Sequence, residues 1–410
     1  MNSKSAERLI RYCRIDTQSD PKNSGTVPST QKQFDLAKVL YQELQELGLK
    51  NVRLDEHCYV YGILPSNLDH PAKRVGFVAH MDTAPDYSGT GVNPRIIENY
   101  DGGDIELCEG VVTKTADFPR MKELKGKDLI VTDGSTLLGA DDKAGITAIM
   151  EALVWMREHP EFRHGDVAVG FTPDEEIGNG PKYFDVENFG ADFAYTMDGG
   201  EIRYLCDETF NAASAVIDIA GFSIHPGSAK DKMINAVSMA AVLHNLLPAH
   251  MRPEHTDRYD GFFHLTELNG TMDAAHMEYI IRDHNAAKLE EKKEILRKAV
   301  DYLNEMIGTE AAKLTITDSY RNMKEILDQN PEVSEYAWKG IEDLGLVPGM
   351  ESARGGTDGA TLTYMGLPCP NLGTGGGNAH GRYEYCVVEE LEQASQLILN
   401  IIRRVGETAL

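Results

Sequence analysis

The chain has little cysteine, no long apolar run and no excess of positive charge. Its six cysteines are scattered over 410 residues with no C-x-x-C pair, so neither a disulfide framework nor a thiolate zinc site is indicated. No stretch approaches the roughly 18 apolar residues of a membrane span, and residues 1–20 lack the apolar block of a secretory signal. We therefore expect a cytoplasmic protein with reduced cysteines.

The charge balance is acidic, with 40 basic and 65 acidic residues and a formal net charge of −25. A field of this sign repels phosphate backbones and anionic lipid headgroups, so we expect neither nucleic acid nor a membrane surface as a partner. With 41% hydrophobic and 26% charged residues, the composition is that of a folded globular chain. The length leaves room for two or three domains.

Short apolar runs alternate with helical patterns over most of the chain. Strand-length runs occupy residues 59–64, 75–79, 167–171 and 193–197, whereas residues 144–156 repeat apolar side chains at helical spacing. Another helix is expected after Ser29 or Thr30, either of which can cap it, and Gly48 can end it. The alternation predicts an α/β domain with a central, mostly parallel sheet flanked by helices.

The pattern changes between about Asn211 and Tyr320. Strands are expected at 213–219, as a pair within 261–282 and at 313–318, with helices at 235–247 and 286–306. The α/β pattern then resumes. We therefore predict a discontinuous domain of residues 1–210 and 321–410, with an α+β domain of residues 211–320 inserted in it.

Histidines and carboxylates lie where the predicted strands end. In an open α/β sheet, ligands bind at the carboxyl ends of the strands, so separate segments would bring these side chains to one crevice. Five candidate metal ligands are found in this way: His80, Glu175, Glu176, Asp198 and His380.

Two further carboxylates fit such a centre. Asp82 lies two residues after His80 and could accept the free ring N–H of a metal-bound imidazole. Asp141 lies in a glycine-bearing turn before a helix, where it could bridge two cations or cap the helix. Imidazoles and carboxylates without thiolates favour a zinc pair, and manganese or cobalt would fit the same ligands.

Adjacent Glu175 and Glu176 suit two different tasks, because neighbouring side chains point in different directions. One can bind metal while the other holds the attacking water. A metal lowers the pKa of its bound water from about 15.7 toward about 7, and a carboxylate can then take the proton and deliver it to the leaving group. The pattern predicts metal-assisted hydrolysis.

These segments resemble a known family. Residues 80–83, 139–145, 173–178, 198–200 and 380–381 are similar to motifs of the co-catalytic zinc metallopeptidases related to aminoacylase and carboxypeptidase G, and the similarity covers nearly the whole chain. It implies a zinc-peptidase-like catalytic domain, with the inserted domain as a lid. The implied activity is release of the N-terminal residue from tripeptides. Hydrolysis of an N-acyl amino acid or of a C-terminal residue is the alternative.

The resemblance also implies roles for the residues of the centre. Glu175 would be the general base and acid, and Asp82 would orient His80. One zinc ion would be held by His80, Asp141 and Asp198, and the other by Asp141, Glu176 and His380.

Five further residues are candidates for contacts with the substrate. The resemblance makes His225 a lid histidine that stabilises the oxyanion, a role that suits a positioned imidazole donor. Arg282 and Arg354 are candidates for the peptide's terminal carboxylate because a guanidinium binds it through two hydrogen bonds; an ordinary salt bridge is the alternative for Arg282. Asn235 and Asn378 are further candidates.

The expected partners are short peptides with a free N-terminus. A homodimer is also considered, in which His225 could serve its own site or a partner's. One stretch departs from the family pattern, since residues 374–379 contain no aromatic residue where related sequences carry one. This changes the expected shape of the site near His380.

Other classes of protein are less well supported. The glycine run at 373–377 lacks the Lys-Ser/Thr of a P-loop and the third spaced glycine of a dinucleotide fingerprint. An aspartic protease would pair Asp82 with Asp358 in a mostly β fold, against the α/β alternation. A metal or peptide carrier would have no use for Glu175 as a water-activating carboxylate.

Overall fold

The computed structural model describes residues 3–408, and the chain divides into two compact units. The first unit contains Met1–Asp207, Glu325–Glu351 and Thr357–Leu410, and the second contains Glu208–Lys324 and Ser352–Gly356. The outer limits of the predicted domains, residues 1 and 410, lie outside the described residues. In sequence, the second unit is inserted in the first.

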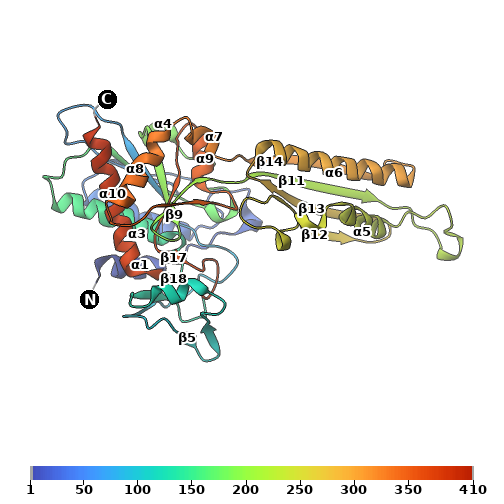
Figure 1. Cartoon of the computed structure of the whole chain (residues 1–410), viewed down its shortest axis with the longest axis horizontal. Helices are drawn as coiled ribbons and strands as arrows, with labels where there is room; N and C mark the ends of the chain where they lie inside the picture. Colours follow the sequence, from blue (N-terminus) through green and yellow to red (C-terminus); the bar gives the residue numbers. More distant parts are fainter. Residues whose placement is uncertain (1–2, 409–410) are drawn as a thin grey trace. The chain divides into compact units, whose positions relative to one another are not determined.

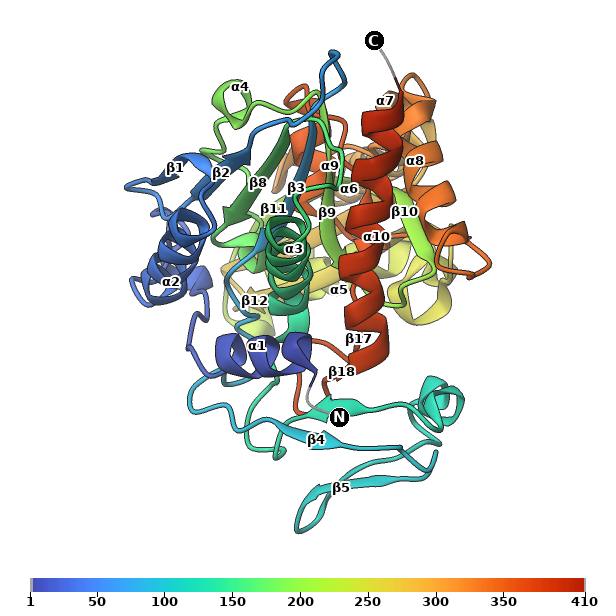
Figure 2. The ribbon, with the colours of Figure 1, turned by 90° about the vertical axis from the view of Figure 1, so that its left-hand side faces the viewer.

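The first unit is built on an eight-stranded sheet, seen through its helices in Figure 2. Its strands, in spatial order, are β1 (Lys50–Leu54), β2 (Val60–Leu64), β8 (Val167–Thr172), β3 (Val75–His80), β9 (Phe193–Gly199), β16 (Asn371–Gly373), β10 (Tyr204–Glu208) and β15 (Gly349–Ser352). The run β8-β3-β9-β16 is parallel, whereas β1, β2 and β10 pair antiparallel. The predicted α/β class with a parallel sheet is confirmed, and antiparallel strands flank its parallel centre.

Helices cover both faces of this sheet because the central strands are apolar along their whole length. Every residue of β3 and β8 is buried, as is typical of parallel strands between two helical layers. Figure 2 shows α3 and α10 in front of the sheet. The helices are α1 (Lys4–Cys13), α2 (Gln33–Glu46), α3 (Ala140–Glu158), α4 (Val186–Phe189), α7 (Lys324–Leu327), α8 (Pro331–Glu342), α9 (Asp358–Tyr364) and α10 (Val388–Glu407).

A smaller antiparallel sheet joins distant segments of the first unit. It contains β17 (Gly376–Gly377), β18 (Tyr385–Val387), β7 (Leu129–Val131) and β4 (Arg95–Ile97), in that order, and a hairpin of β5 (Ile105–Cys108) and β6 (Val111–Thr113) lies in the same part of the sequence. Since β18 pairs with β7, the loop that contains His380 is fastened to the segment that leads into α3.

The start of α2 differs from the prediction. Neither Ser29 nor Thr30 caps the helix, and its N-cap residue, Lys32, forms no side-chain cap. The Ser29 hydroxyl donates instead to Asp174 at 2.6 Å, and the Thr30 hydroxyl donates to the Gln18 carbonyl at 2.7 Å. The capping prediction was wrong because both hydroxyls have tertiary partners that are distant in sequence.

The second unit is an antiparallel sheet with two helices packed on it (Figure 1). Its strands follow the order β12 (Phe262–Gly270), β13 (Ala274–Asp283), β11 (Asn211–Ala220) and β14 (Ala312–Tyr320), and its helices are α5 (Ala236–Leu246) and α6 (Ala286–Ile307). Alternate residues of β11 and β13 join the core, as expected for strands with one covered face. None of the helices within residues 3–408 is long and apolar enough to cross a membrane.

One glycine sets the distance between α3 and β9. A Cβ atom on Gly145 would lie 1.9 Å from the carbonyl oxygen of Met197 in β9. Alanine at a helical glycine normally adds about 1 kcal/mol of stability, but a clash with backbone cannot be relieved by a side-chain rotation. The close approach places the start of α3, with Asp141, beside the strand that carries Asp198.

We predict that Gly145→Ala lowers the free energy of unfolding by about 1–3 kcal/mol, the usual range for overpacking. Urea denaturation followed by circular dichroism would measure it. The matched control is Gly25→Ala, because a Cβ at Gly25 meets no atom within 4 Å. Equal stability of the two variants would contradict the prediction.

Candidate metal centre and active site

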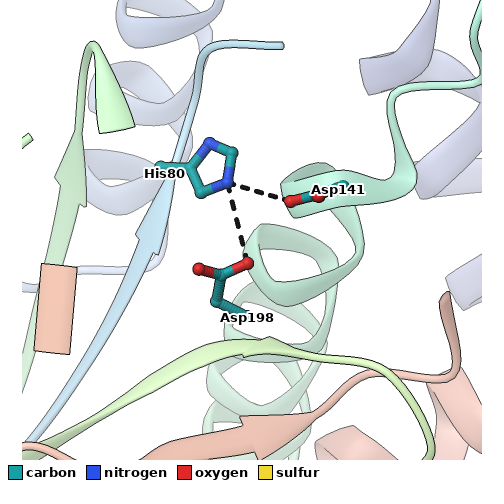
Figure 3. A group of neighbouring side chains, drawn as sticks. All are labelled: His80, Asp141 and Asp198. Carbon is teal, nitrogen blue, oxygen red and sulfur yellow. Dashed lines mark hydrogen bonds and ion pairs between the residues drawn. The ribbon is translucent and has the colours of Figure 1, made fainter. Parts of the chain in front are cut away.

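Three strand and helix ends bring His80, Asp141 and Asp198 together (Figure 3). His80 ends β3, Asp198 lies near the end of the neighbouring strand β9, and Asp141 lies in the first turn of α3. The His80 Nε2 atom lies 3.0 Å from Asp141 Oδ1 and 3.7 Å from Asp198 Oδ1. The parallel neighbours β3 and β9 thus deliver two of the side chains to one edge of the sheet.

A second group shares Asp141. The His380 Nε2 atom lies 3.3 Å from Asp141 Oδ2 and 3.0 Å from Glu176 Oε2. The candidate ligand atoms within each group all lie within 4.8 Å of one another. The two oxygens of Asp141 therefore face two different histidines, which is the arrangement that a bridging carboxylate requires.

Asp142, rather than Asp141, caps the helical part of α3. Asp141 and Asp142 have non-helical backbone angles, and the peptide bond between them is cis. The Asp142 carboxylate accepts the Gly145 N–H at 3.2 Å and the His80 N–H at 3.2 Å. The carboxylate of Asp141 is thereby left to the two histidines.

The histidines and carboxylates shift one another's pKa values. Hydrogen bonds to Asp141 and Glu176 raise the pKa of His380 to about 11. Burial opposes protonation of His80, but hydrogen bonds to Asp141, Asp198 and Asp82 raise its pKa well above the usual range. Burial raises the pKa of Glu176 to about 7. These shifts show a strongly negative centre in which positive charge is favoured.

The donor set fits divalent metal ions. Imidazole nitrogen and carboxylate oxygen are ligands for zinc, manganese and cobalt, and each group offers one imidazole and two carboxylates. The Glu176 Oε1 atom is buried without a hydrogen-bond partner, which is costly unless a cation or another donor compensates. These features support metal use at this centre.

Asp82 contacts His80, but its carboxylate also binds a second segment. Its Oδ1 atom lies 3.4 Å from His80 Nδ1, whereas its own carbonyl oxygen is closer, at 3.0 Å. The carboxylate accepts the backbone N–H groups of Glu175 at 2.9 Å and Glu176 at 3.2 Å. Asp82 thus links the end of β3 to the turn that follows β8.

Glu175 has a partly buried carboxylate in this turn. Burial raises its pKa well above the usual range, and no side chain or backbone group within residues 3–408 forms a hydrogen bond or ion pair with its carboxylate. A carboxylate of this kind holds a proton more readily than one in water. The arrangement suits proton transfer.

The residues that hold this turn from the other side were not predicted from the sequence. Asp174 is fully buried in a left-handed conformation with φ of 54°. Its carboxylate accepts hydrogen bonds from the Ser29 N–H, the Ser29 hydroxyl and the Gln33 side-chain amide, each at 2.6 Å. The sequence signal at this position was Ser29 near a helix start, which was interpreted as a possible cap.

A cavity of about 150 Å³ adjoins the centre. Asp141 and Asp198 line one part of it, and the stretch without aromatic residues contributes Gly376, Gly377 and Asn378. The Asn378 side-chain amide donates to the Tyr383 carbonyl at 3.2 Å, so this candidate residue borders the cavity while holding its own loop.

The arginines expected to bind substrate differ in their partners. Arg282 lies over the Tyr320 ring at 4.7 Å, and its Nη1 atom is buried without a partner. Burial lowers its pKa to about 10. Arg354 donates to the carbonyls of Arg258 at 2.5 Å and Asp260 at 3.2 Å. Arg282 is therefore the arginine with unused hydrogen-bonding capacity.

The other two candidates in the second unit have local roles. The Asn235 carboxamide oxygen caps α5 by accepting the Ser238 N–H at 3.1 Å. The Nδ1 atom of exposed His225 accepts the Gly227 N–H at 3.1 Å, so the neutral ring carries its proton on Nε2. That nitrogen is a donor, as the predicted oxyanion contact requires. The substrate roles of both residues stay predictions.

Comparisons with known proteins identify the family. A model of peptidase family M20/M25/M40 matches residues 132–404. Peptidase T of Alkaliphilus oremlandii is 50% identical over 400 residues, which cover 97% of this chain and 98% of the relative. The chain belongs to this metallopeptidase family, and the resemblance indicated by its motifs is confirmed.

Two solved structures share the fold. Aminopeptidase PepT from Bacillus cereus has a TM-score of 0.78 at 23% identity and covers 98% of each chain. A tripeptidase from Staphylococcus aureus has a TM-score of 0.79 at 21% identity, with 99% of this chain and 98% of that chain covered. The zinc-peptidase-like fold is thus confirmed.

We predict that Asp82→Asn lowers metal affinity or peptidase activity by about 10- to 100-fold, the usual effect of losing an outer partner of a ligand. In the variant, the NH₂ group of the carboxamide would face one of the backbone N–H groups whose hydrogen bond the carboxylate accepts, so that hydrogen bond would be lost. Competition with a chromogenic chelator would measure metal affinity. Asp55→Asn is the matched control, because Asp55 also accepts two backbone N–H groups, from His57 and Tyr59. An equal, small effect of both variants would contradict the prediction.

Proposed function

We propose that the chain is a zinc-dependent aminopeptidase that releases the N-terminal residue from tripeptides. The observation that carries the proposal is the pair of ligand groups that share Asp141, with the unpaired Glu175 carboxylate on the adjoining turn. The relative named peptidase T and the structures described as an aminopeptidase and a tripeptidase support the choice of substrate.

Two ions would be held by five side chains of the first unit. His80, Asp141 and Asp198 would hold one, and Asp141, Glu176 and His380 the other. When bound, such ions supply Lewis-acid activation of water and of the peptide carbonyl. Zinc is the metal proposed, and manganese or cobalt could occupy the same ligands.

The protein's own groups would handle the protons and orient the substrate. The Glu175 carboxylate takes a proton from the attacking water and delivers it to the nitrogen of the leaving peptide. Asp82 fixes the His80 ring and the turn of Glu175. The Nε2–H of His225 donates to the negative charge that develops on the carbonyl oxygen.

The C-terminal carboxylate of the substrate peptide requires a positively charged side chain to bind it. Arg282 is proposed for this role because its buried Nη1 has no partner, so an incoming carboxylate would supply one. Binding the carboxylate at a fixed distance from the scissile bond would select peptides by length.

The remaining proposals are a free substrate N-terminus, a cytoplasmic location and a homodimer.

We predict that chelation abolishes hydrolysis and that added zinc, cobalt or manganese restores it. A free tripeptide should be the best substrate, followed by di- and tetrapeptides, and an N-acetylated tripeptide should not be cleaved. Glu175→Ala should lose about 10²- to 10⁴-fold in kcat, whereas Glu187→Ala, at an exposed position of α4, should not. Cleavage of the acetylated tripeptide would favour the N-acyl hydrolase instead.

We predict that Arg282→Ala removes the preference for a free C-terminal carboxylate. A charged hydrogen bond is worth about 1.5–3 kcal/mol, so kcat/KM for a tripeptide should fall about 10- to 100-fold. The same peptide with an amidated C-terminus should be a poor substrate of both proteins. Arg297→Ala, at an exposed position of α6, is the control. Loss of the preference in Arg354→Ala alone would transfer the role to Arg354.

A further inference from the structure

Glu384 is a buried carboxylate with an unusual set of partners. It is 2% exposed and lies four residues after His380. Its Oε2 atom accepts the N–H groups of Leu138 and Gly139, both at 2.7 Å, and its Oε1 atom accepts the Asp141 N–H at 2.9 Å. All three donors belong to the turn that begins α3.

This turn is shaped to bind an anion. Gly139 has φ of 80°, a left-handed conformation that glycine adopts without strain and that allows successive N–H groups to point toward one acceptor. A buried carboxylate is costly without such donors, and no lysine, arginine or histidine within residues 3–408 forms an ion pair with Glu384. Three backbone N–H groups are thus the hydrogen-bond donors to this carboxylate among the described residues.

Glu384 connects the two segments that supply ligands to the second group. Asp141 carries its shared carboxylate on one segment, and His380 lies on the other. The His380 loop needs such a connection, since its side chain is 47% exposed and its backbone has φ of 63°. Within the described residues, the His380 ring forms ion pairs with Asp141 and Glu176 and with one further carboxylate, that of Asp86 at 3.7 Å.

We propose that Glu384 is a positioning residue that holds Asp141 in register with His380. The inference rests on the proposed function, in which these two side chains hold a metal ion. Glu384 belongs to neither candidate ligand group. It sets the direction of the shared carboxylate through the backbone, so its loss loosens the second group more than the first, where strands β3 and β9 fix His80 and Asp198.

The substitutions remove the three hydrogen bonds in steps. Glu384→Gln keeps one acceptor oxygen and turns an NH₂ group toward a backbone donor, whereas Glu384→Ala removes every acceptor. Glu389→Gln is the matched control, because Glu389 also accepts a backbone N–H, from Asp128 at 3.2 Å. Glu389 follows β18 and contacts no candidate ligand.

The first measurement is hydrogen exchange in the metal-free protein. The amides of Leu138, Gly139 and Asp141 should exchange at least about 10-fold faster in Glu384→Gln than in the parent. Their exchange rates should be unchanged in Glu389→Gln. The second is zinc affinity by chelator competition, where the weaker of two binding steps should fall about 10- to 100-fold. The loss should be greater in Glu384→Ala, and if that variant does not fold, Glu384→Gln carries the test.

Three results would overturn the inference. The first is hydrogen exchange of the amides of residues 138, 139 and 141 at the rate of the parent protein. The second is a zinc affinity that is reduced no more than in Glu389→Gln. The third is a lower thermal stability while the affinities of both zinc-binding steps and kcat are unchanged. Each leaves the proposed function intact if the parent protein hydrolyses peptides with zinc. A parent that binds no zinc would instead overturn both, and the exchange result would show whether the turn is still held.

Discussion

The centre depends on one carboxylate facing two ways. Asp141 directs Oδ1 toward His80 and Oδ2 toward His380, although these histidines are 300 residues apart in the sequence. The direction of that carboxylate is fixed by the start of α3, where Asp142 takes the capping role and Gly145 allows the helix to approach β9. Without this arrangement the five candidate ligands would form two unrelated clusters.

Buried carboxylates that bind backbone amides recur around the centre. Asp82 holds the turn of Glu175, Asp142 holds His80, Asp174 holds the segment at Ser29, and Glu384 holds the turn of Asp141. A carboxylate accepts strong hydrogen bonds from several N–H groups at once, so each can join two segments that the sheet alone does not connect. The irregular turns are therefore tied to neighbouring segments by side-chain as well as backbone hydrogen bonds.

The sequence was sufficient to predict which site residues lie at the ends of the central strands. Apolar runs of strand length placed His80, Glu175, Glu176 and Asp198 at strand ends, because parallel neighbours end at the same edge. The role of Asp142 was not predicted, since a cap at either of two adjacent aspartates gives the same pattern. The contact of Ser29 with Asp174 and the role of Glu384 were not predicted, because the partners lie more than 100 residues away and no local periodicity indicates such contacts.

The segment between α1 and α2 contributes no candidate ligand, yet it touches both loops on which the centre is built. Its Gln18 amide donates to the carbonyls of Ala84 and Tyr87 after β3, and its Ser29 binds Asp174 after β8. A single proteolytic cut between Gln18 and Ser29 would leave every candidate ligand in the chain while breaking the covalent link between these two contacts. A stretch far from the ligands in sequence therefore takes part in holding the two loops.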